Sequence, residues 1–212
     1  MPARATSTRR PRRAARDKAD VLAGARRVVA RLGADATRFN DVATETGTAV
    51  STLQYSFGNR TDLILATLQR SSEVDLERMR AVLARHEDPV SQLRAIVRES
   101  LLGSGEDEAR ESWLVWVEYW RTAARDDEVR QEWWGFYDEW TAVIVKTLRA
   151  GAAAGDFSLA SDGIDEARLV LALLDGFGLP VVLRHSALDR SAAADRVLRT
   201  LATVLDCQAL AG

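Results

Sequence analysis

The sequence predicts an all-α protein of about nine helices. Ala, Leu, Arg and Glu, which all favour helices, dominate the 212 residues, and only four prolines interrupt them. Apolar residues recur at helical spacing, and no stretch alternates apolar and polar residues around a turn pair such as Asn-Gly, as a hairpin would. An apolar content of 47% is enough for a core in one or two domains.

The first quarter of the chain predicts a basic arm and three helices. Residues 1–16 carry Arg, Ala, Pro, Ser and Thr with little to bury, so we expect a disordered arm. A helix should follow from about Asp17 to Leu32, because its apolar residues share one face and Gly33 comes directly after them. Two short helices are expected near residues 37–46 and 49–56, joined by Gly47 in a tight turn.

Six longer helices are expected after this region, near residues 59–86, 89–103, 106–124, 126–150, 164–185 and 190–207. Pro89 opens the second of them, and the Gly103-Ser104-Gly105 break ends it. Residues 151–157 are expected to be a flexible link. The Gly176-Phe177-Gly178 segment is too short for a nucleotide site, and we expect it to let two helices approach closely.

Charge is distributed unevenly along the chain. Residues 1–60 hold 12 Arg and Lys against 5 Asp and Glu, whereas residues 61–212 hold 17 against 26. A basic front indicates contact with a polyanion, and a merely solvated tail is the alternative for the first 16 residues. The single Cys207, the lack of an 18-residue uncharged apolar run and the lack of a signal peptide predict a cytoplasmic protein that does not enter membranes.

Residues 39–63 have the pattern of a helix-turn-helix, in which the second helix enters the major groove of DNA. The apolar spine of such a unit can be formed by Val42, Ala43, Leu53 and Phe57. Small and amide side chains can face bases, namely Ser51, Thr52 and Gln54, while phosphates would suit Tyr55, Ser56 and Arg60. The alternative is a purely structural corner in a helical bundle.

In this stretch the chain resembles the TetR family of one-component transcriptional regulators. That family typically reads Gly-Val-Ser-x-Gly-Thr-Leu-Tyr-Tyr-His-Phe before a polar pair, Lys and a Leu-rich helix. Residues 47–63 read Gly-Thr-Ala-Val-Ser-Thr-Leu-Gln-Tyr-Ser-Phe-Gly-Asn-Arg-Thr-Asp-Leu, and Asp-Val-Ala precedes them at 41–43. The resemblance implies an N-terminal three-helix DNA-binding domain with a helix-turn-helix, followed by a C-terminal helical domain for ligand binding and dimerisation.

The resemblance also implies which residues contact DNA. Arg38 and Asn40 would contact phosphates, and Tyr55, Ser56 and Arg60 would anchor the backbone. The groove would be faced by Thr48, Val50, Ser51, Thr52 and Gln54. Ala49 replaces the usual capping Ser, so we expect Thr48 to cap the recognition helix instead. Gln54 and Ser56 replace the common Tyr and His, which is expected to alter base preference.

All six tryptophans fall on two consecutive predicted helices. Core packing is the alternative for about half of these aromatic residues, but each Trp also brings an N–H that a purely structural core does not need. We therefore predict a cavity for an aromatic, lipophilic or cationic small molecule, with Asp138 or Asp175 as further acidic candidates. Its expected lining is Trp113, Trp116, Glu118, Trp120, Trp133, Trp134, Tyr137 and Phe177.

This half of the chain is similar to the subgroup of the family that includes the choline-responsive repressor of betaine synthesis. The similarity rests on residues 113–120, Trp-Leu-Val-Trp-Val-Glu-Tyr-Trp, on the link 151–157, and on residues 173–179, Leu-Leu-Asp-Gly-Phe-Gly-Leu. Family resemblance implies that the last two helices form a dimer interface. A dimer would place two recognition helices in successive major grooves of a palindromic operator.

The predicted function is a ligand-responsive regulator, a repressor that binds DNA as a homodimer and is released by a small molecule. Its parts would be the arm 1–16, a DNA-binding domain 17–60 and a ligand-binding and dimerisation domain 61–212. The alternatives are a small-molecule-binding or adaptor protein without a DNA role, and an enzyme that uses the same pocket. No nucleophile signature or phosphate-binding loop supports an enzyme or a cofactor, and His86, His185 and Cys207 lack metal-ligand spacing.

Overall fold

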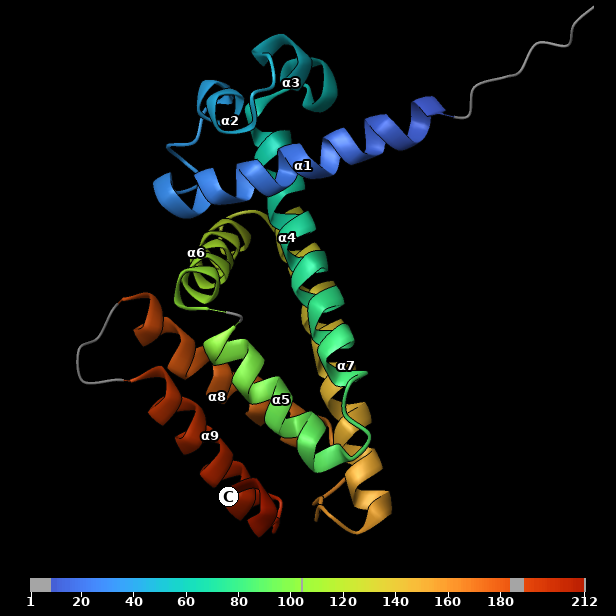
Figure 1. Cartoon of the computed structure of the whole chain (residues 1–212). Helices are drawn as coiled ribbons and strands as arrows, with labels where there is room; N and C mark the ends of the chain where they lie inside the picture. The colour runs from blue at the N-terminus through green and yellow to red at the C-terminus, as the bar shows by residue number, and fades with distance from the viewer. Residues whose placement is uncertain (1–8, 104, 184–188, 212) are drawn as a thin grey trace, which may run out of the picture. The chain divides into compact units, whose positions relative to one another are not determined.

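The chain is all-α in the computed structural model, as the sequence predicts (Figure 1). The structure describes residues 9–103, 105–183 and 189–211. Within these residues there are nine α-helices and a short 3-10 helix, Gln208–Ala211, and no strand. None of the described helices is long and apolar enough to cross a membrane.

The chain divides into two compact units, residues 1–71 and residues 72–212. The division falls inside one helix, α4 (Arg60–Leu83), so the first half of α4 belongs to the N-terminal unit and the second half to the C-terminal unit. We expected the boundary between residues 60 and 61. Leu63 and Ala66, on the first half of α4, pack in the N-terminal core, so the compact N-terminal unit also takes in the first half of that helix.

The N-terminal unit folds α1 (Arg9–Leu32), α2 (Phe39–Thr46) and α3 (Val50–Phe57) around one apolar core. That core consists of Val21, Leu22, Ala25, Val28, Val42, Leu53, Phe57 and Leu63, with Ala43 packed against it. The predicted apolar spine of the helix-turn-helix is therefore confirmed. Gly47 has a φ of +67°, where any side chain is strained, and this conformation turns the chain from α2 into α3.

Helix α1 begins at Arg9 rather than near Asp17. Residues 9–16, which we expected to be disordered, form its first turns, and residues 1–8 lie outside the described residues. Arg and Ala are good helix formers, and Pro11 falls in the first turn, where a missing N–H has no helical acceptor to lose. Helix propensity thus extends α1 beyond the point where the apolar pattern starts.

Helices α1 and α2 approach closely at Gly24. A Cβ at this position would lie 2.3 Å from Cγ2 of Thr46, so a larger residue would push the helices apart. Beside this contact the Glu45 carboxylate pairs with Arg27 at 2.7 Å and with Arg31 at 3.4 Å. The hydrogen bond from Arg27 is the main cause that lowers the pKa of Glu45. Close packing and these ion pairs together fix α2 on α1.

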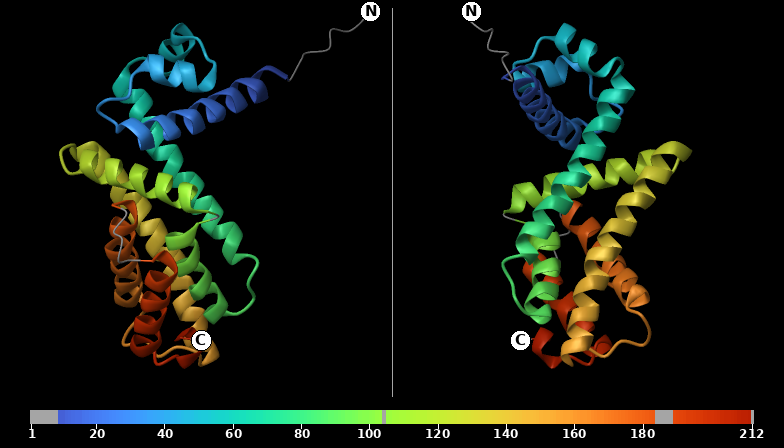
Figure 2. Two further views of the ribbon diagram at one scale, coloured as in Figure 1. Left: turned by 60° about the vertical axis from the view of Figure 1, so that its left-hand side comes forward. Right: turned by 90° about the vertical axis from the view of Figure 1, so that its right-hand side faces the viewer.

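The C-terminal unit contains the second half of α4 and five further helices, which are α5 (Pro89–Leu102), α6 (Glu106–Ala123), α7 (Asp127–Ala154), α8 (Ile164–Val182) and α9 (Arg190–Val204). Helix α5 packs against α7, α8 and α9 and supplies the centre of the core (Figure 2). Four of its apolar side chains are completely buried, namely Leu93, Ile96, Val97 and Leu101. The predicted long helices are therefore confirmed within a few residues at each end.

Helix α7 continues further than predicted and takes in part of the expected link at residues 151–157. It ends at Ala154, with Gly155 in the left-handed conformation at φ +81°. The ring of Phe157 lies against Gly151, where a Cβ would be 2.1 Å from the ring. Because Phe157 is buried at this contact, the chain leaving α7 is fixed to the helix it has just left.

Candidate functional site

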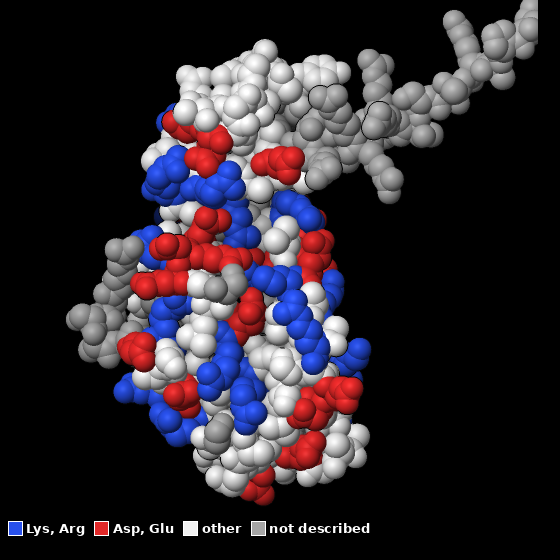
Figure 3. All heavy atoms as spheres, in the orientation of Figure 1, with Lys and Arg blue, Asp and Glu red and all other residues white. Residues whose placement is uncertain are grey.

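The outer face of α3 is polar and uncharged. Its exposed side chains are Ser51, Thr52, Gln54, Tyr55 and Ser56, and Tyr55 retains 94% of its accessible surface. Leu53 and Phe57, on the opposite side of the same helix, are buried and hold it to the core. Figure 3 shows that the surface over α3 is largely free of charged residues. Such a face offers hydrogen-bonding groups of the kind that read base edges.

The predicted contacts flanking α3 differ in exposure. Arg38 and Asn40 are exposed at the start of α2, whereas Thr48 and Val50 are half-buried. The Asp41 carboxylate accepts a hydrogen bond of 2.8 Å from the backbone N–H of Arg38, which caps α2. At α3 the N-cap residue is Ala49 and no side chain caps the helix, so the cap expected from Thr48 does not form.

Arg60, predicted to contact phosphate, has partners inside the N-terminal unit. Its Nη1 donates to the backbone carbonyl of Ala34 at 2.8 Å, and the carbonyls of Asp35 and Thr37 lie at 3.3 and 3.4 Å. These bonds hold the loop between α1 and α2 to the start of α4. Arg60 therefore has a structural role that its sequence position did not indicate.

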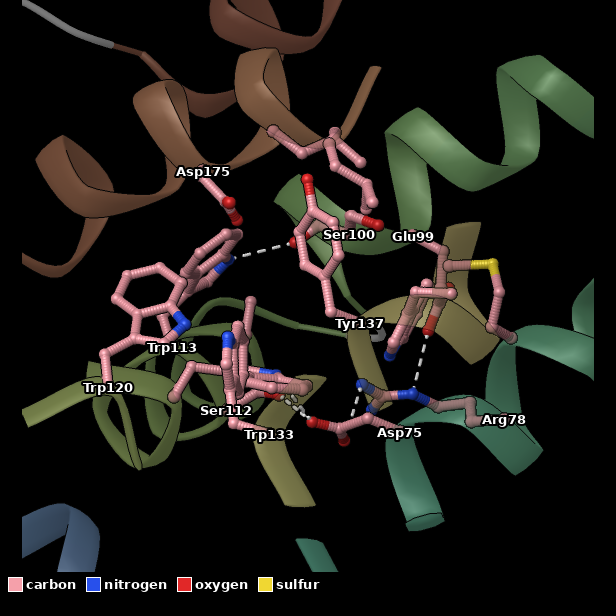
Figure 4. A pocket seen from close by; sticks show the side chains of 16 residues that line it. Asp75, Arg78, Glu99, Ser100, Ser112, Trp113, Trp120, Trp133, Tyr137 and Asp175 are labelled. Atoms are coloured by element: carbon pink, nitrogen blue, oxygen red, sulfur yellow. Dashed lines mark hydrogen bonds and ion pairs between the residues drawn. The ribbon is translucent and has the colours of Figure 1, made fainter. Parts of the chain in front are cut away.

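A pocket of about 80 Å³ lies within the C-terminal unit (Figure 4). Five helices line it: α4 with Asp75, Arg78 and Met79; α5 with Glu99 and Ser100; α6 with Ala109, Ser112, Trp113, Trp116 and Trp120; α7 with Trp133, Tyr137 and Trp140; and α8 with Leu171, Leu174 and Asp175. Aromatic rings thus form much of its wall, and carboxylates and one guanidinium contribute the charge.

The structure brings five of the eight predicted lining residues together in this pocket, namely Trp113, Trp116, Trp120, Trp133 and Tyr137. The other three lie elsewhere. Trp134 is 53% exposed and packs edge-on against Tyr137, with ring centroids 5.4 Å apart. Phe177 packs against the apolar core, and Glu118 pairs with Arg121 on its own helix at 3.1 Å.

The aromatic wall is a connected set of rings centred on Trp133. Its ring meets Trp116, Tyr119 and Trp120 edge-on, with centroids 5.0, 5.5 and 5.9 Å apart. Each edge-to-face contact of this kind stabilises the packing of its two rings by more than the burial of their surface alone. The wall therefore presents pre-arranged ring faces and edges to the pocket.

Trp113 is fixed from two sides. Its indole N–H donates to the backbone carbonyl of Ser100 on α5 at 3.0 Å. Its ring lies against Gly178 on α8, where a Cβ would come within 2.2 Å of Cζ2. At Gly178 the missing Cβ leaves room for the Trp113 side chain of α6; the close approach of two helices expected for Gly176-Phe177-Gly178 stays a prediction.

Asp175, on α8, has the most perturbed carboxylate in the pocket. Burial raises the pKa of Asp175 to about 6. Its carboxylate makes no hydrogen bond or ion pair within the described part of the chain, and aromatic side chains share the pocket with it. A partly buried, uncompensated carboxylate near indole rings favours a cation, which would restore the charge balance and also contact ring faces.

A second carboxylate, Asp75 on α4, is satisfied within the protein. Its Oδ2 accepts hydrogen bonds from the Ser112 hydroxyl at 2.6 Å and from the indole N–H of Trp116 at 3.2 Å. Arg78 lies near Oδ1 at 3.4 Å and also pairs with Glu99 and Glu108. This network ties α4 to α5 and α6 along one side of the pocket.

The described residues hold no group of three or more His, Cys, Asp or Glu placed to bind a metal ion.

Both halves of the chain match known families. Residues 89–206 match the family described as BetI-type transcriptional repressor, C-terminal, and residues 21–67 match bacterial regulatory proteins of the tetR family. The first match alone spans more than half of the chain. The chain belongs to the TetR family. It is a DNA-binding transcriptional regulator of the ligand-responsive kind, and the resemblance found in the sequence is confirmed.

Solved structures of other TetR-family regulators share its fold. A putative transcriptional regulator from Saccharomonospora viridis in complex with choline is 27% identical, with a TM-score of 0.77 over 87% of this chain and 94% of the other. A putative TetR-family regulator from Rhodococcus sp. is 21% identical, with a TM-score of 0.75 over 90% and 99%. FadR from Bacillus subtilis in complex with stearoyl-CoA is 19% identical, with a TM-score of 0.69 over 88% and 98%. The curated proteins include no match to this sequence.

Within this TetR-family regulator, sequence reasoning missed the pocket residues of α4 and α5 and one tryptophan of α7. These are Asp75, Arg78, Met79, Glu99, Ser100 and Trp140. Trp140 follows Trp133 at helical spacing, so the same periodicity could have added it. The charged residues of α4 carried no such signal, because they resemble the many solvated charges of other helices.

Proposed function

We propose that this TetR-family regulator is a homodimeric repressor that binds a palindromic operator and is released when a small organic cation enters the aromatic pocket. It would act in the cytoplasm and by binding alone, without catalysis. The observation that carries the effector class is Asp175, a carboxylate without a protein partner in the described chain, set among indole rings.

A cation suits this pocket better than a neutral ligand does. Burial disfavours the ionised form of Asp175, as its raised pKa shows, and a bound cation would remove that cost. The rings of Trp113, Trp120 and Trp133 would add cation–π attraction. This attraction is strongest for Trp and for weakly hydrated cations, which lose little hydration energy on entering the pocket. The similar regulator from Saccharomonospora viridis, described in complex with choline, supports the same class of ligand.

The proposed DNA contacts come from α3 and its flanks. Gln54, with Ser51 and Thr52, would read base edges, because all three are exposed and an amide can bond adenine at two positions. Thr48 and Val50 would lie at the edge of the groove. Tyr55, Ser56, Arg38, Asn40 and Arg60 would bond phosphates, although Arg60 also holds the loop after α1.

Dimerisation would use α8 and α9. Both helices leave large apolar side chains exposed, with Leu169 at 36%, Leu179 at 42% and Val204 at 42%. Exposed apolar residues on both helices support an interaction surface there, if they form one contiguous patch in the dimer. Helices α8 and α9 are neighbours in the fold. A second copy of the chain would cover this face and supply the second recognition helix that a palindrome requires.

Helix α4 is the proposed link between effector and operator. Its second half lines the pocket through Asp75, Arg78 and Met79, and its first half holds Leu63 in the core beneath α3. An effector acts only through its differential affinity for two conformations, and a coupling of about 1–3 kcal/mol is typical. A modest shift of α4 would therefore be enough to release the operator.

The test is an operator-binding titration on DNA upstream of the protein's own coding region. Binding should weaken steeply with salt, because phosphate contacts release counterions. Choline should weaken it further, whereas 3,3-dimethyl-1-butanol, the neutral isostere with carbon in place of nitrogen, should not. Release by the neutral isostere at equal concentration would contradict the cationic effector. A protein that binds choline but no DNA would be a small-molecule binder without a regulatory role.

A further inference from the structure

Asp75 is a buried carboxylate that accepts hydrogen bonds from the protein's own side chains. Only 6% of this residue is exposed, and it sits on the half of α4 that belongs to the C-terminal unit. One of its oxygens accepts a hydrogen bond from the Ser112 hydroxyl (Figure 4) and a second one from the indole N–H of Trp116. These two donors lie one turn apart on α6, so both face α4 together.

A buried carboxylate depends strongly on its donors. Leaving such a group short of hydrogen bonds costs far more than the same loss in water, so partial separation of α4 and α6 is disfavoured. Because Ser112 and Trp116 share one helix, a movement of α6 affects both bonds at once.

Trp116 also belongs to the pocket wall. Its ring meets Trp133 edge-on at 5.0 Å and lies nearly parallel to Tyr119, with centroids 6.3 Å apart and planes inclined by 18°. The indole N–H that bonds Asp75 is part of the same rigid ring system. A ligand that displaces this ring in the pocket must therefore also displace the hydrogen bond to α4.

We propose that Asp75 is the positioning residue through which the pocket controls α4: the ring of Trp116 senses the effector, and its N–H, together with Ser112, transmits the change to the Asp75 carboxylate. This proposal rests on the proposed function, since it assumes that effector binding releases the operator. It adds the specific contact that carries the signal. Helix α4 then carries it on, as one continuous helix, to Leu63 in the N-terminal core.

Trp116→Phe and Trp133→Phe form a matched pair for the test. Both remove an indole from the same pocket wall, and both should weaken choline binding. Only Trp116 bonds Asp75, since the N–H of Trp133 makes no hydrogen bond to the described residues. The quantity measured is the release factor, the ratio of operator Kd values with and without saturating choline. We expect Trp116→Phe to lower that factor at least tenfold, and Trp133→Phe to change it less than threefold.

Equal release factors in the two variants, at choline concentrations that saturate each, would overturn the proposed role of the hydrogen bond between Trp116 and Asp75. If choline fails to release the wild-type protein, the effector class of the proposed function is wrong, and the role of Asp75 is then decided by the double-substitution cycle below, which needs no effector. Ser112→Ala gives a milder break of the same contact if Trp116→Phe does not fold. It should lower the release factor about threefold, and an unchanged factor would count against the proposal.

A double-substitution cycle tests the contact without any effector. Asp75→Asn and Trp116→Phe are compared singly and together for operator affinity in the absence of choline. If the two residues act through one hydrogen bond that positions α4, their effects should be non-additive by at least threefold. If Asp75 and Trp116 have only a structural role, the substitutions should lower the melting temperature, but their effects on the operator affinity of the folded protein should be additive. That result would refute the proposal.

Discussion

The two candidate sites of this regulator are built in opposite ways. The residues proposed to read bases, Ser51, Thr52 and Gln54, lie on one eight-residue helix, α3, and their side chains are exposed. The pocket draws its lining from five helices, α4 to α8, and most of its side chains are wholly or partly buried. A surface of the first kind can change one residue at a time, whereas in the pocket each residue also supports its neighbours.

The largest expected effect lies on α3. Replacing both Gln54 and Tyr55 by Ala should weaken operator binding by roughly 100-fold or more, because a bidentate base contact is worth about 1–3 kcal/mol and a phosphate contact is lost with it. Choline affinity should stay unchanged, since neither residue packs in a core. Fluorescence anisotropy on labelled operator DNA measures the first quantity, and calorimetry the second. A concurrent loss of choline binding would contradict the view that the surface of α3 and the pocket are independent sites.

The next effect separates two carboxylates near the aromatic wall. Asp175→Asn should weaken choline binding by roughly 10- to 100-fold, because it removes the charge opposite the cation, and an attraction between two charges at about 4 Å is strong where water is partly excluded. Asp138→Asn is the matched control, since Asp138 is exposed on α7 and does not line the pocket. Isothermal titration calorimetry gives both affinities. Equal losses of affinity would mean that the overall negative charge of this region, and not Asp175 in particular, attracts the ligand.

Gly178→Ala tests how tightly the pocket wall is packed. The added methyl would come within 2.2 Å of the Trp113 ring, so the ring or helix α8 must move. Overpacking of this kind costs about 1–3 kcal/mol, and thermal unfolding should begin several degrees lower. Gly176→Ala is the control, because a Cβ there meets nothing within 4 Å and Ala favours helix by up to about 1 kcal/mol. Destabilisation by both substitutions would refute the packing argument.

The smallest effect is a pH dependence of the pocket. The folded protein raises the pKa of Asp175 from 3.8 to about 6, so its ionised form is disfavoured before a ligand binds. Choline should bind about tenfold more weakly at pH 5 than at pH 7, as the carboxylate takes up a proton. For the same reason, this group stabilises the ligand-free fold most at low pH and loses that contribution as pH rises from about 4 to 6. Asp175→Asn should show a flat choline affinity over this range.

Sequence reasoning reached the two sites to different depths, for a physical reason. The exposed face of α3 follows from local periodicity, because a short amphipathic helix has only one way to bury Leu53 and Phe57. For the pocket, the tryptophans of α6 and α7 were visible as a cluster, but adjacent residues on a helix point about 100° apart. Trp133 therefore faces the pocket while Trp134 faces solvent, and the sequence alone could not say which.

Contributions from distant helices were out of reach. Asp75, Arg78 and Glu99 sit on helices rich in solvated charges, and only tertiary packing shows that these three meet. The early start of α1 was missed for the opposite reason, since residues 9–16 form helix through propensity without an apolar face to reveal it. The start of α3 was also missed: the sequence suggested a cap from Thr48, but the backbone places Ala49 at the N-cap, where no side chain caps the helix.

Gly178 has a consequence for how regulators of this kind diversify. It does not line the pocket, yet it sets how far the Trp113 ring can retreat from it. Selection for a new effector could therefore act on α8, where a single added methyl would reshape the binding volume without altering any atom that the ligand meets. In comparisons between relatives, a change at this position is expected to track a change of inducer even when every lining residue is identical.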